Sequence, residues 1–157
     1  MAQEDLKIGI EKFDEVLPEL LPLLEEQYIE NEPGYVEQGI ELDPDFDIYR
    51  LLEQKQNLFV VVLRIDGKII GYFVMLKQPH LHHRSKALCS VDILYVAPEH
   101  RGGSAIFTLM EFMVGMCDML QAKWLRIGMK VDQKFEKLLK NNNFELDEVV
   151  YSLDLGK

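Results

Sequence analysis

Apolar and polar residues recur along the chain with two periods, which predict strands and helices in turn. Residues 6–12 alternate apolar and polar side chains, and this predicts a short first strand. Residues 14–31 carry apolar side chains at helical spacing, although Pro22 inside that pattern predicts a kink or a later start. A second helix is expected over residues 46–56, after an irregular segment over 35–47.

The middle of the chain predicts a β-hairpin. Residues 58–65 and 68–77 are rich in β-branched and aromatic side chains, and Asp66-Gly67 between them favours a type I′ turn. Residues 87–96 follow as a further strand, and the intervening residues 78–86 are expected to form a loop.

The last third of the chain contains both helical and strand patterns. A long helix is predicted by apolar residues that share one helical face: Ile106, Leu109, Met110, Met113, Val114, Cys117 and Leu120. A strand over 124–131, a helix over 133–140 and two strands over 144–148 and 149–155 follow. The order β-α-α-β-β-β-α-β-α-β-β predicts an α/β fold with a mixed sheet, in a single domain over residues 1–157.

Charge and composition exclude several classes of protein. The formal net charge is −10, which argues against nucleic acid as a ligand because phosphate contacts need a basic face. No apolar run approaches the roughly 18 residues of a membrane helix, and the N-terminus lacks the pattern of a signal peptide. Cys89 and Cys117 have no metal-ligand spacing and are expected to be reduced, buried thiols of a cytoplasmic protein.

The acidic residues are unevenly placed. The segment from Phe13 to Tyr49 contains no Lys or Arg, yet it holds Glu25, Glu26, Glu30, Glu32, Glu37, Glu41, Asp43, Asp45 and Asp47. One interpretation is an ordinary solvated face. The other is a negative rim that attracts a cationic partner.

Residues 91–109 carry the most specific pattern of the chain. An apolar strand is followed by a turn at Pro98, a loop of small residues and an amphipathic helix. This order leaves unpaired backbone N–H groups at the start of a helix, where they can hold a phosphate. The alternative is a strand-to-helix turn without a ligand.

This stretch resembles the GCN5-related N-acetyltransferase (GNAT) family, and the predicted element order extends the resemblance over nearly the whole chain. The family pattern is V-x-P, then x-x-R-G-x-G-[ILV]-[GA]-x-x-L at the start of a helix. The residues that match in register are Val96, Pro98, Arg101, Gly102 and Leu109, whereas Ser104 replaces a glycine and Ile106 replaces a small residue.

The resemblance implies acetyl-CoA as cosubstrate. In the family, this loop binds the pyrophosphate, and here the implied residues are Arg101, Gly102, Gly103, Ser104, Ala105 and Ile106. Leu94, Tyr95 and Val96 would pair with the pantetheine arm as an added strand would. Members often protonate the departing thiolate with a tyrosine, but Leu139 stands at that position. Tyr151 or a water could stand in, and the alternative is an exposed thiolate that needs no acid catalyst.

Asp92 is the candidate catalytic residue. It is the only side chain charged at neutral pH within an apolar strand, and a carboxylate there is costly unless it is paired or useful. Strand alternation places it on one face with Ser90, Leu94 and Val96. We interpret it as the base or the group that orients the amine; the alternative is a structural carboxylate that caps backbone or pairs with Lys or Arg.

His80, His82 and His83 have three interpretations: a solvated loop, a role in acceptor binding or proton relay, or a metal site. The last has no nearby Cys or acid to complete a ligand set, and no metal is expected. The Pro-His-x-His string also resembles those of small phage-encoded acetyltransferase-like proteins.

The sequence thus predicts an acetyl-CoA-dependent N-acetyltransferase that acts by direct attack of a primary amine on the thioester. The acceptor is expected to be a cationic small molecule or peptide amine, since the family builds its acceptor wall where the acidic run lies. Two alternatives stay open: a protein of this fold that binds a partner without catalysis, and an unrelated α/β module. A homodimer also stays open, because dimers are common in the family.

Overall fold

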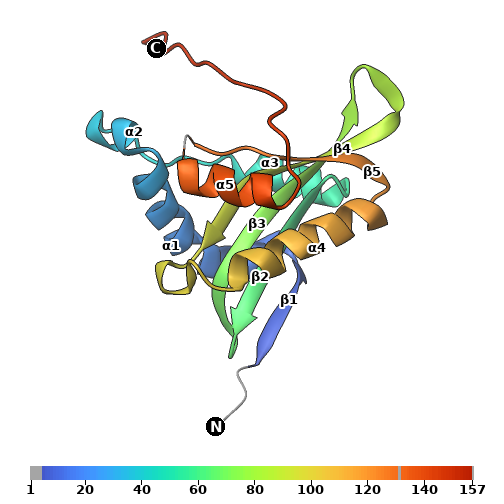
Figure 1. Cartoon of the computed structure of the whole chain (residues 1–157). Coiled ribbons are helices and arrows are strands. Elements are labelled where there is room, and N and C mark those ends of the chain that lie inside the picture. Colours follow the sequence, from blue (N-terminus) through green and yellow to red (C-terminus); the bar gives the residue numbers. More distant parts are fainter. Residues whose placement is uncertain (1–4, 131, 157) are drawn as a thin grey trace.

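A five-stranded sheet forms the centre of the molecule in a computed structural model that describes residues 5–130 and 132–156 (Figure 1). Its strands lie in chain order across the sheet: β1 (Leu6–Glu11), β2 (Leu58–Ile65), β3 (Lys68–His80), β4 (His83–Val96) and β5 (Ala122–Ile127). The first four strands are antiparallel, and β5 runs parallel to β4. The predicted mixed α/β sheet is therefore confirmed.

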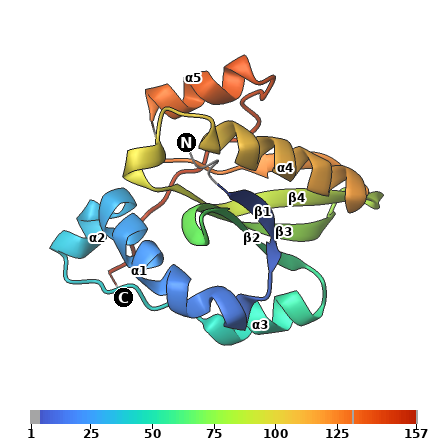
Figure 2. The same cartoon turned by 90° about the horizontal axis from the view of Figure 1, so that it is seen from below.

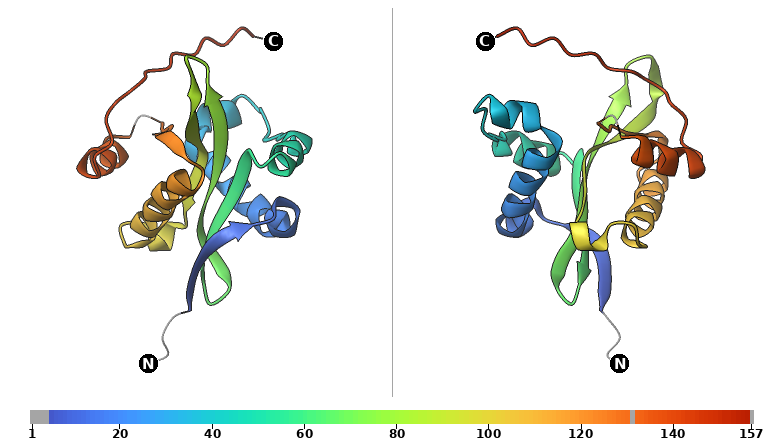
Figure 3. Two further views of the ribbon diagram at one scale, coloured as in Figure 1. Left: turned by 90° about the vertical axis from the view of Figure 1, so that its right-hand side faces the viewer. Right: turned by 60° about the vertical axis from the view of Figure 1, so that its left-hand side comes forward.

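Helices cover both faces of the sheet, as Figures 2 and 3 show. One face carries α1 (Phe13–Asn31), the short α2 (Pro33–Glu37) and α3 (Phe46–Gln54). The other face carries α4 (Ala105–Met119) and α5 (Gln133–Asn141). In the described part of the chain, no helix is both long and apolar enough to cross a bilayer.

Two apolar cores fill the spaces between the sheet and its helix layers. Successive residues of a strand point to opposite faces, so Tyr72 enters the core beneath α1 while its neighbour Phe73 enters the core beneath α4. Val60 and Val61 divide between the two cores in the same way. Burial on both faces explains why β2 and β3 read as continuous apolar runs.

The hairpin and the first helix test two local predictions. Asp66 and Gly67 have φ values of +48° and +83°, as a type I′ turn requires, so that prediction is confirmed. Helix α1 runs without interruption from Phe13 through Pro22, and the later start that Pro22 suggested is wrong. Phe13, Val16 and Leu20 are buried on this helix, and their packing stabilises the first turns.

The expected loop over residues 78–86 is mostly strand. Gln78 pairs with Leu88 and Pro79 with Ala87, and only Leu81 and His82 form the turn. These paired residues are largely exposed and polar, so they lack the apolar alternation that would have marked a strand. Main-chain pairing continues here because the register is already set by the buried part of the hairpin.

The end of the chain corrects the predicted element order. Residues 144–156 form no regular secondary structure, so the strands predicted over 144–148 and 149–155 are wrong for this structure. Figure 1 shows this segment leaving α5 and extending away from the sheet, where it finds no strand to pair with. The strand predicted over 124–131 is instead Ala122–Ile127, and Val131 lies outside the described residues, as do the ends of the predicted domain over 1–157.

Candidate active site

A β-bulge at Asp92 shapes the second half of β4. Val74 of β3 pairs with Ile93, whereas the next residue, Met75, pairs with Val91. Asp92 is therefore the extra residue of a bulge, and it has no partner on β3.

The bulge overturns the predicted distribution of β4 side chains between the two faces. Ser90, Asp92, Leu94 and Val96 were expected on one face, opposite Cys89, Val91, Ile93 and Tyr95. In the structure, Cys89 and Val91 share the core beneath α4 with Leu94 and Val96, while Ile93 and Tyr95 lie in the core beneath α1. One extra residue shifts the two-residue period by one step, and every later side chain changes face.

Beyond the bulge, β4 has an open edge. β5 pairs with β4 only from Ala87 to Val91, and none of the described residues continues that pairing along residues 92–96. The Ala97 N–H donates to the Ile70 carbonyl at 2.8 Å, which fixes the alternation of the β3–β4 ladder. By that alternation the N–H and C=O groups of Leu94 and Val96 point away from β3, toward the open edge.

The chain passes from this edge directly into a loop with anion-binding geometry. A short 3₁₀ turn, Pro98–His100, leads to Gly102, whose φ of +82° lies in the left-handed region that glycine adopts without strain. Helix α4 then begins at Ala105, and the Ser104 side chain makes no capping hydrogen bond. The first N–H groups of α4 therefore have no partner within the helix, and the helix dipole favours an anion beside them.

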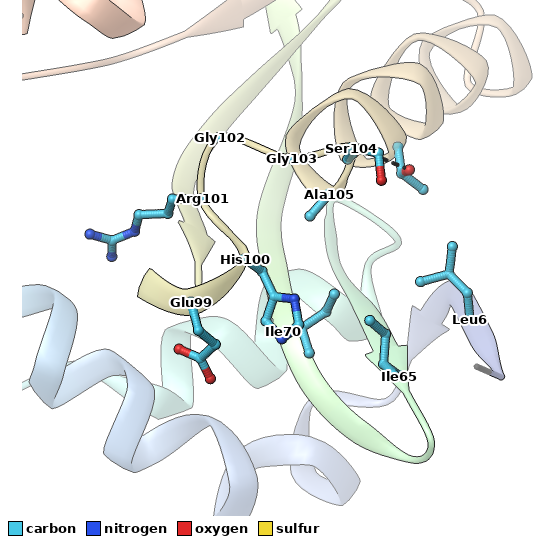
Figure 4. Close-up of a pocket in the computed structure, with 11 residues that line it drawn as sticks. Leu6, Ile65, Ile70, Glu99, His100, Arg101, Gly102, Gly103, Ser104 and Ala105 are labelled. Carbon is cyan, nitrogen blue, oxygen red and sulfur yellow. Dashed lines mark hydrogen bonds between the residues drawn. The ribbon is translucent and has the colours of Figure 1, made fainter. Parts of the chain in front are cut away.

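A hollow of about 380 Å³ lies against this loop (Figure 4). Its lining includes every residue from Glu99 to Ala105, so the structure brings together most of the predicted pyrophosphate residues. Its other wall consists of Leu6, Ile65 and Ile70, which places it on the β1 side of the loop; neither Asp92 nor Leu94 lines it. Ile106 is absent from the lining and packs against the core beneath α4, so its branched side chain does not fill the hollow.

Arg101 lines the hollow, but its guanidinium is hydrogen-bonded to other parts of the protein. Its Nε donates to the Val96 carbonyl at 2.8 Å, and its Nη2 donates to Oε2 of Glu30 on α1 at 2.8 Å. Figure 4 shows the side chain pointing away from His100 and Ile70. The hydrogen bond from Arg101 lowers the pKa of the Glu30 carboxyl, so both partners are charged at neutral pH. Sequence reasoning missed Glu30 as a partner, because no local pattern links residues so far apart.

Asp92 is exposed on the side of the sheet that faces α3. Its negative charge adds to the effect of burial in raising the pKa of the Tyr49 hydroxyl. None of the described residues forms an ion pair or hydrogen bond with the Asp92 carboxylate, so the structure gives no support to its alternative role as a paired structural acid. Its carboxylate is accessible at the point where β4 and β5 separate.

The tyrosines near the open edge are weak acids. Burial, followed by the charge of Glu26, raises the pKa of Tyr95 to about 12, and burial also raises the pKa of Tyr72. Leu139 is buried on α5 and carries no proton to donate. Tyr151 is 92% exposed on the C-terminal segment and contributes to no core.

The three histidines gather at the tip of the β3–β4 hairpin. The ring centroids of His80 and His83 are 4.7 Å apart, and the indole of Trp124 lies 4.9 Å from His80. Burial and the nearby His83 lower the pKa of His80, which favours its neutral form. His83 and Asp92 lie nine positions apart along β4, roughly 25–30 Å, so the histidine rings cannot exchange a proton with Asp92 directly. Among the described residues, no group of three His, Cys, Asp or Glu side chains could hold a metal ion.

The acidic run is partly neutralised within the chain. Besides Glu30, Glu32 pairs with Lys130 at 2.7 Å, Asp47 pairs with Arg50 at 2.9 Å, and Asp45 caps α3. Glu25, Glu37, Glu41 and Asp43 are exposed, and the described residues offer them no ion pair. A net negative surface therefore remains over the end of α1 and the α2–α3 connection.

The mixed sheet, the open edge of β4 and the glycine loop before α4 match the acyl-CoA N-acyltransferase fold. Residues 17–127 match the model of the Acetyltransferase (GNAT) family, which is more than half of the chain. The chain therefore belongs to the GNAT family, and the predicted fold and acetyltransferase class are confirmed. No curated protein matches the chain.

Solved structures show the same fold at low sequence identity. A ribosomal-protein-alanine N-acetyltransferase from Brucella melitensis biovar Abortus has a TM-score of 0.72 and 20% identity, with 97% of this chain and 100% of that chain covered. An aminoglycoside acetyltransferase from an uncultured soil sample, in complex with sisomicin, has a TM-score of 0.73 and 17% identity, with 96% of each chain covered. A predicted acetyltransferase from Clostridium acetobutylicum, solved with acetyl-CoA, has a TM-score of 0.69 and 12% identity, with 96% of this chain and 97% of that chain covered.

Proposed function

We propose that this protein transfers an acetyl group from acetyl-CoA to a primary amine of a cationic acceptor. The observation that carries the proposal is one continuous strip of backbone: the open β4 edge at Leu94 and Val96 leads directly to Gly102 and the uncapped start of α4. The edge suits an extended amide-containing arm, and the helix start suits a diphosphate. Acetyl-CoA carries both, together with an activated thioester.

Specific residues of the chain have distinct roles in this proposal. Leu94, Tyr95 and Val96 hold the arm of the cosubstrate through their backbone, and residues 101–106 surround its diphosphate. The Leu94 N–H faces the open edge, where it can stabilise negative charge on the thioester oxygen. Asp92 orients the amine and accepts its proton, because its carboxylate is exposed beside the same edge.

Direct attack by the amine is favoured over an acetylated protein intermediate. Cys89 and Cys117 are both buried in the core beneath α4, so neither thiol is available as a nucleophile. Since Leu139 supplies no proton, the departing thiolate takes its proton from water. The apolar residue at this position is also the observation that favours the second candidate function, a binding protein of this fold without catalysis.

The acidic surface supports a cationic acceptor. Glu37, Glu41 and Asp43 are exposed on the connection that follows α1, the side of the sheet on which Asp92 is exposed. The structural neighbours include proteins named for ribosomal-protein alanine and aminoglycoside acceptors, and both kinds of acceptor carry amines. A polyamine, an aminoglycoside-like amine or a basic peptide would suit this surface.

The first prediction concerns binding of CoA. CoA at about 100 times its Kd should stabilise the folded protein by about 2.7 kcal/mol, which is a rise in Tm of about 5 °C or more. Gly102→Val should abolish this rise, because valine is strained at a φ of +82° and would shift the loop out of its present conformation. Thermal unfolding with and without CoA measures both effects.

Gly39→Val is the matched control for that experiment. Gly39 has a φ of +73°, and like Gly102 it has open space around its missing Cβ. Both variants should lose similar stability without ligand, but Gly39→Val should keep the full CoA-dependent rise. A rise in Tm that survives in Gly102→Val would contradict the assignment of the loop, and no rise in the parent protein would contradict the function.

The second prediction concerns the acceptor. Release of free thiol from acetyl-CoA should be faster with a triamine than with a neutral monoamine, by about tenfold in kcat/KM at low salt, and the difference should shrink as salt screens the surface. Glu41→Lys should reduce this preference, whereas Glu15→Lys, with the same change of charge at the other end of α1, should leave it unchanged. CoA binding without thiol release for any amine would favour the binding protein.

A further inference from the structure

The two carbonyl groups that face the open edge of β4 already accept hydrogen bonds from side chains. Nε2 of Gln27 on α1 donates to the Leu94 carbonyl at 3.0 Å. Nε of Arg101 donates to the Val96 carbonyl at 2.8 Å. The part of the strand expected to pair with an extended ligand is therefore capped by the protein itself.

Both donors are fixed in place by further contacts. Oε1 of Gln27 accepts a hydrogen bond at 3.0 Å from the hydroxyl of Tyr72, a fully buried residue whose raised pKa keeps this proton in place. The Arg101 guanidinium is held by both carboxylate oxygens of Glu30. Gln27 and Glu30 are three residues apart and lie on the same face of α1. This face of the helix is therefore hydrogen-bonded both to the edge of β4 and to Arg101.

Such caps compete with any ligand that pairs with the strand. An extended ligand gains its affinity from main-chain hydrogen bonds along an exposed edge, and these bonds need the Leu94 and Val96 carbonyls. We propose that Gln27 and the Glu30–Arg101 pair form a latch that caps the open β4 edge without ligand and is displaced when the cosubstrate arm binds. This inference rests on the proposed function, since it takes the arm of acetyl-CoA as the occupant.

Displacement of the latch would also change the surface next to the acceptor. Glu30 and Glu32 lie at the end of α1, and Glu32 is joined to Lys130 on the segment after β5 by a 2.7 Å ion pair. Release of Gln27 and Glu30 removes the hydrogen bonds that join this part of α1 to the Leu94 carbonyl and to Arg101. Binding of the cosubstrate would thereby increase the mobility of the acidic C-terminal end of α1.

Gln27→Met tests the latch by keeping the length of the side chain and removing its amide donor. Isothermal titration with CoA should show binding about fivefold tighter than in the parent protein, because the ligand no longer displaces a hydrogen bond. Ile29→Ala is the control: it lies on the same helix, is 61% exposed, and should leave the Kd unchanged. Equal or weaker binding by Gln27→Met would overturn the latch and leave the proposed function standing.

A second measurement needs no variant. Backbone amides of residues 23–31 should exchange hydrogen faster when CoA is bound, although a bound ligand normally slows exchange. Slower or unchanged exchange there, with CoA bound, would overturn the latch. If neither the parent protein nor Gln27→Met binds CoA, both the latch and the proposed function are overturned.

Discussion

Replacing Asp92 with Asn should lower kcat for acetyl transfer by about 100-fold or more, while the Kd for CoA changes by less than about twofold. Asparagine keeps the size of the side chain and can still donate to a carbonyl, but it cannot accept the proton of an ammonium group. Asp92 is the bulge residue of β4 and has no partner on β3. Its carboxylate is exposed next to Val91, where the pairing of β5 with β4 ends. Steady-state rates at saturating acetyl-CoA and amine measure the first quantity, and titration with CoA measures the second.

The control for this experiment is Asp118→Asn. Asp118 is an exposed carboxylate on α4, and its replacement should change neither kcat nor the Kd for CoA. An Asp92→Asn enzyme with unchanged kcat would show that this carboxylate is not the base. A large loss of CoA affinity in the same variant would instead indicate that the Asp92 carboxylate maintains the conformation of the bulge and of the β4 edge beside it.

The sequence predicted the parts of the fold that depend on short-range patterns. The type I′ turn at Asp66-Gly67 follows from two residues. The apolar face of α4 follows from its helical spacing, except that Val114, predicted on this face, is 51% exposed. The glycine at position 102 was predicted in the loop, and it does adopt a left-handed conformation. Each of these features is determined by neighbours along the chain, so a single sequence is enough to find it.

The bulge and the latch could not be predicted in this way. An insertion of one residue in a strand leaves the apolar run of β4 unchanged and is visible only in the pairing of Val74 and Met75. The hydrogen bond from Gln27 joins residues 67 positions apart, and the Glu30–Arg101 pair joins residues 71 positions apart. Arg101 fits the family pattern by position, yet only the structure shows its side chain directed at α1.

At the tip of the β3–β4 hairpin and in the C-terminal segment, the alternation of apolar residues gave wrong predictions of where strands form. Residues 78–86 lack apolar alternation and still mostly form strand, with pairing at Gln78, Pro79 and the His80–His83 pair, whereas residues 149–155 alternate and form no strand. Alternation reports burial of one face, and pairing depends on a partner strand in reach. The two properties coincide in the centre of the sheet and separate at its margins.

The second large effect concerns stability, at the contact that positions α4 on the sheet. Leu109→Ala should lower the free energy of unfolding by about 2–5 kcal/mol, because Leu109 is fully buried in the core beneath α4. Gly71→Ala should lower it by about 1–3 kcal/mol, since a Cβ at this position would lie 3.0 Å from Cδ1 of Leu109 and 3.1 Å from the Tyr95 carbonyl oxygen. Urea denaturation with a two-state fit measures both values.

The double variant distinguishes a shared contact from two separate defects. The methyl group that Gly71→Ala adds would enter space that the shortened side chain leaves, so Gly71→Ala with Leu109→Ala should be less destabilised than the sum of the single variants by about 1 kcal/mol. The compensation is partial, because the Tyr95 carbonyl belongs to β4 and cannot move aside. Gly71→Ala with Met116→Ala is the control pair: Met116 is also buried on α4 but lies away from Gly71, and its effect should add. If the losses of unfolding free energy in Gly71→Ala and Leu109→Ala were additive, the contact between β3 and α4 at these residues would not position α4. Other contacts would then hold the start of the helix.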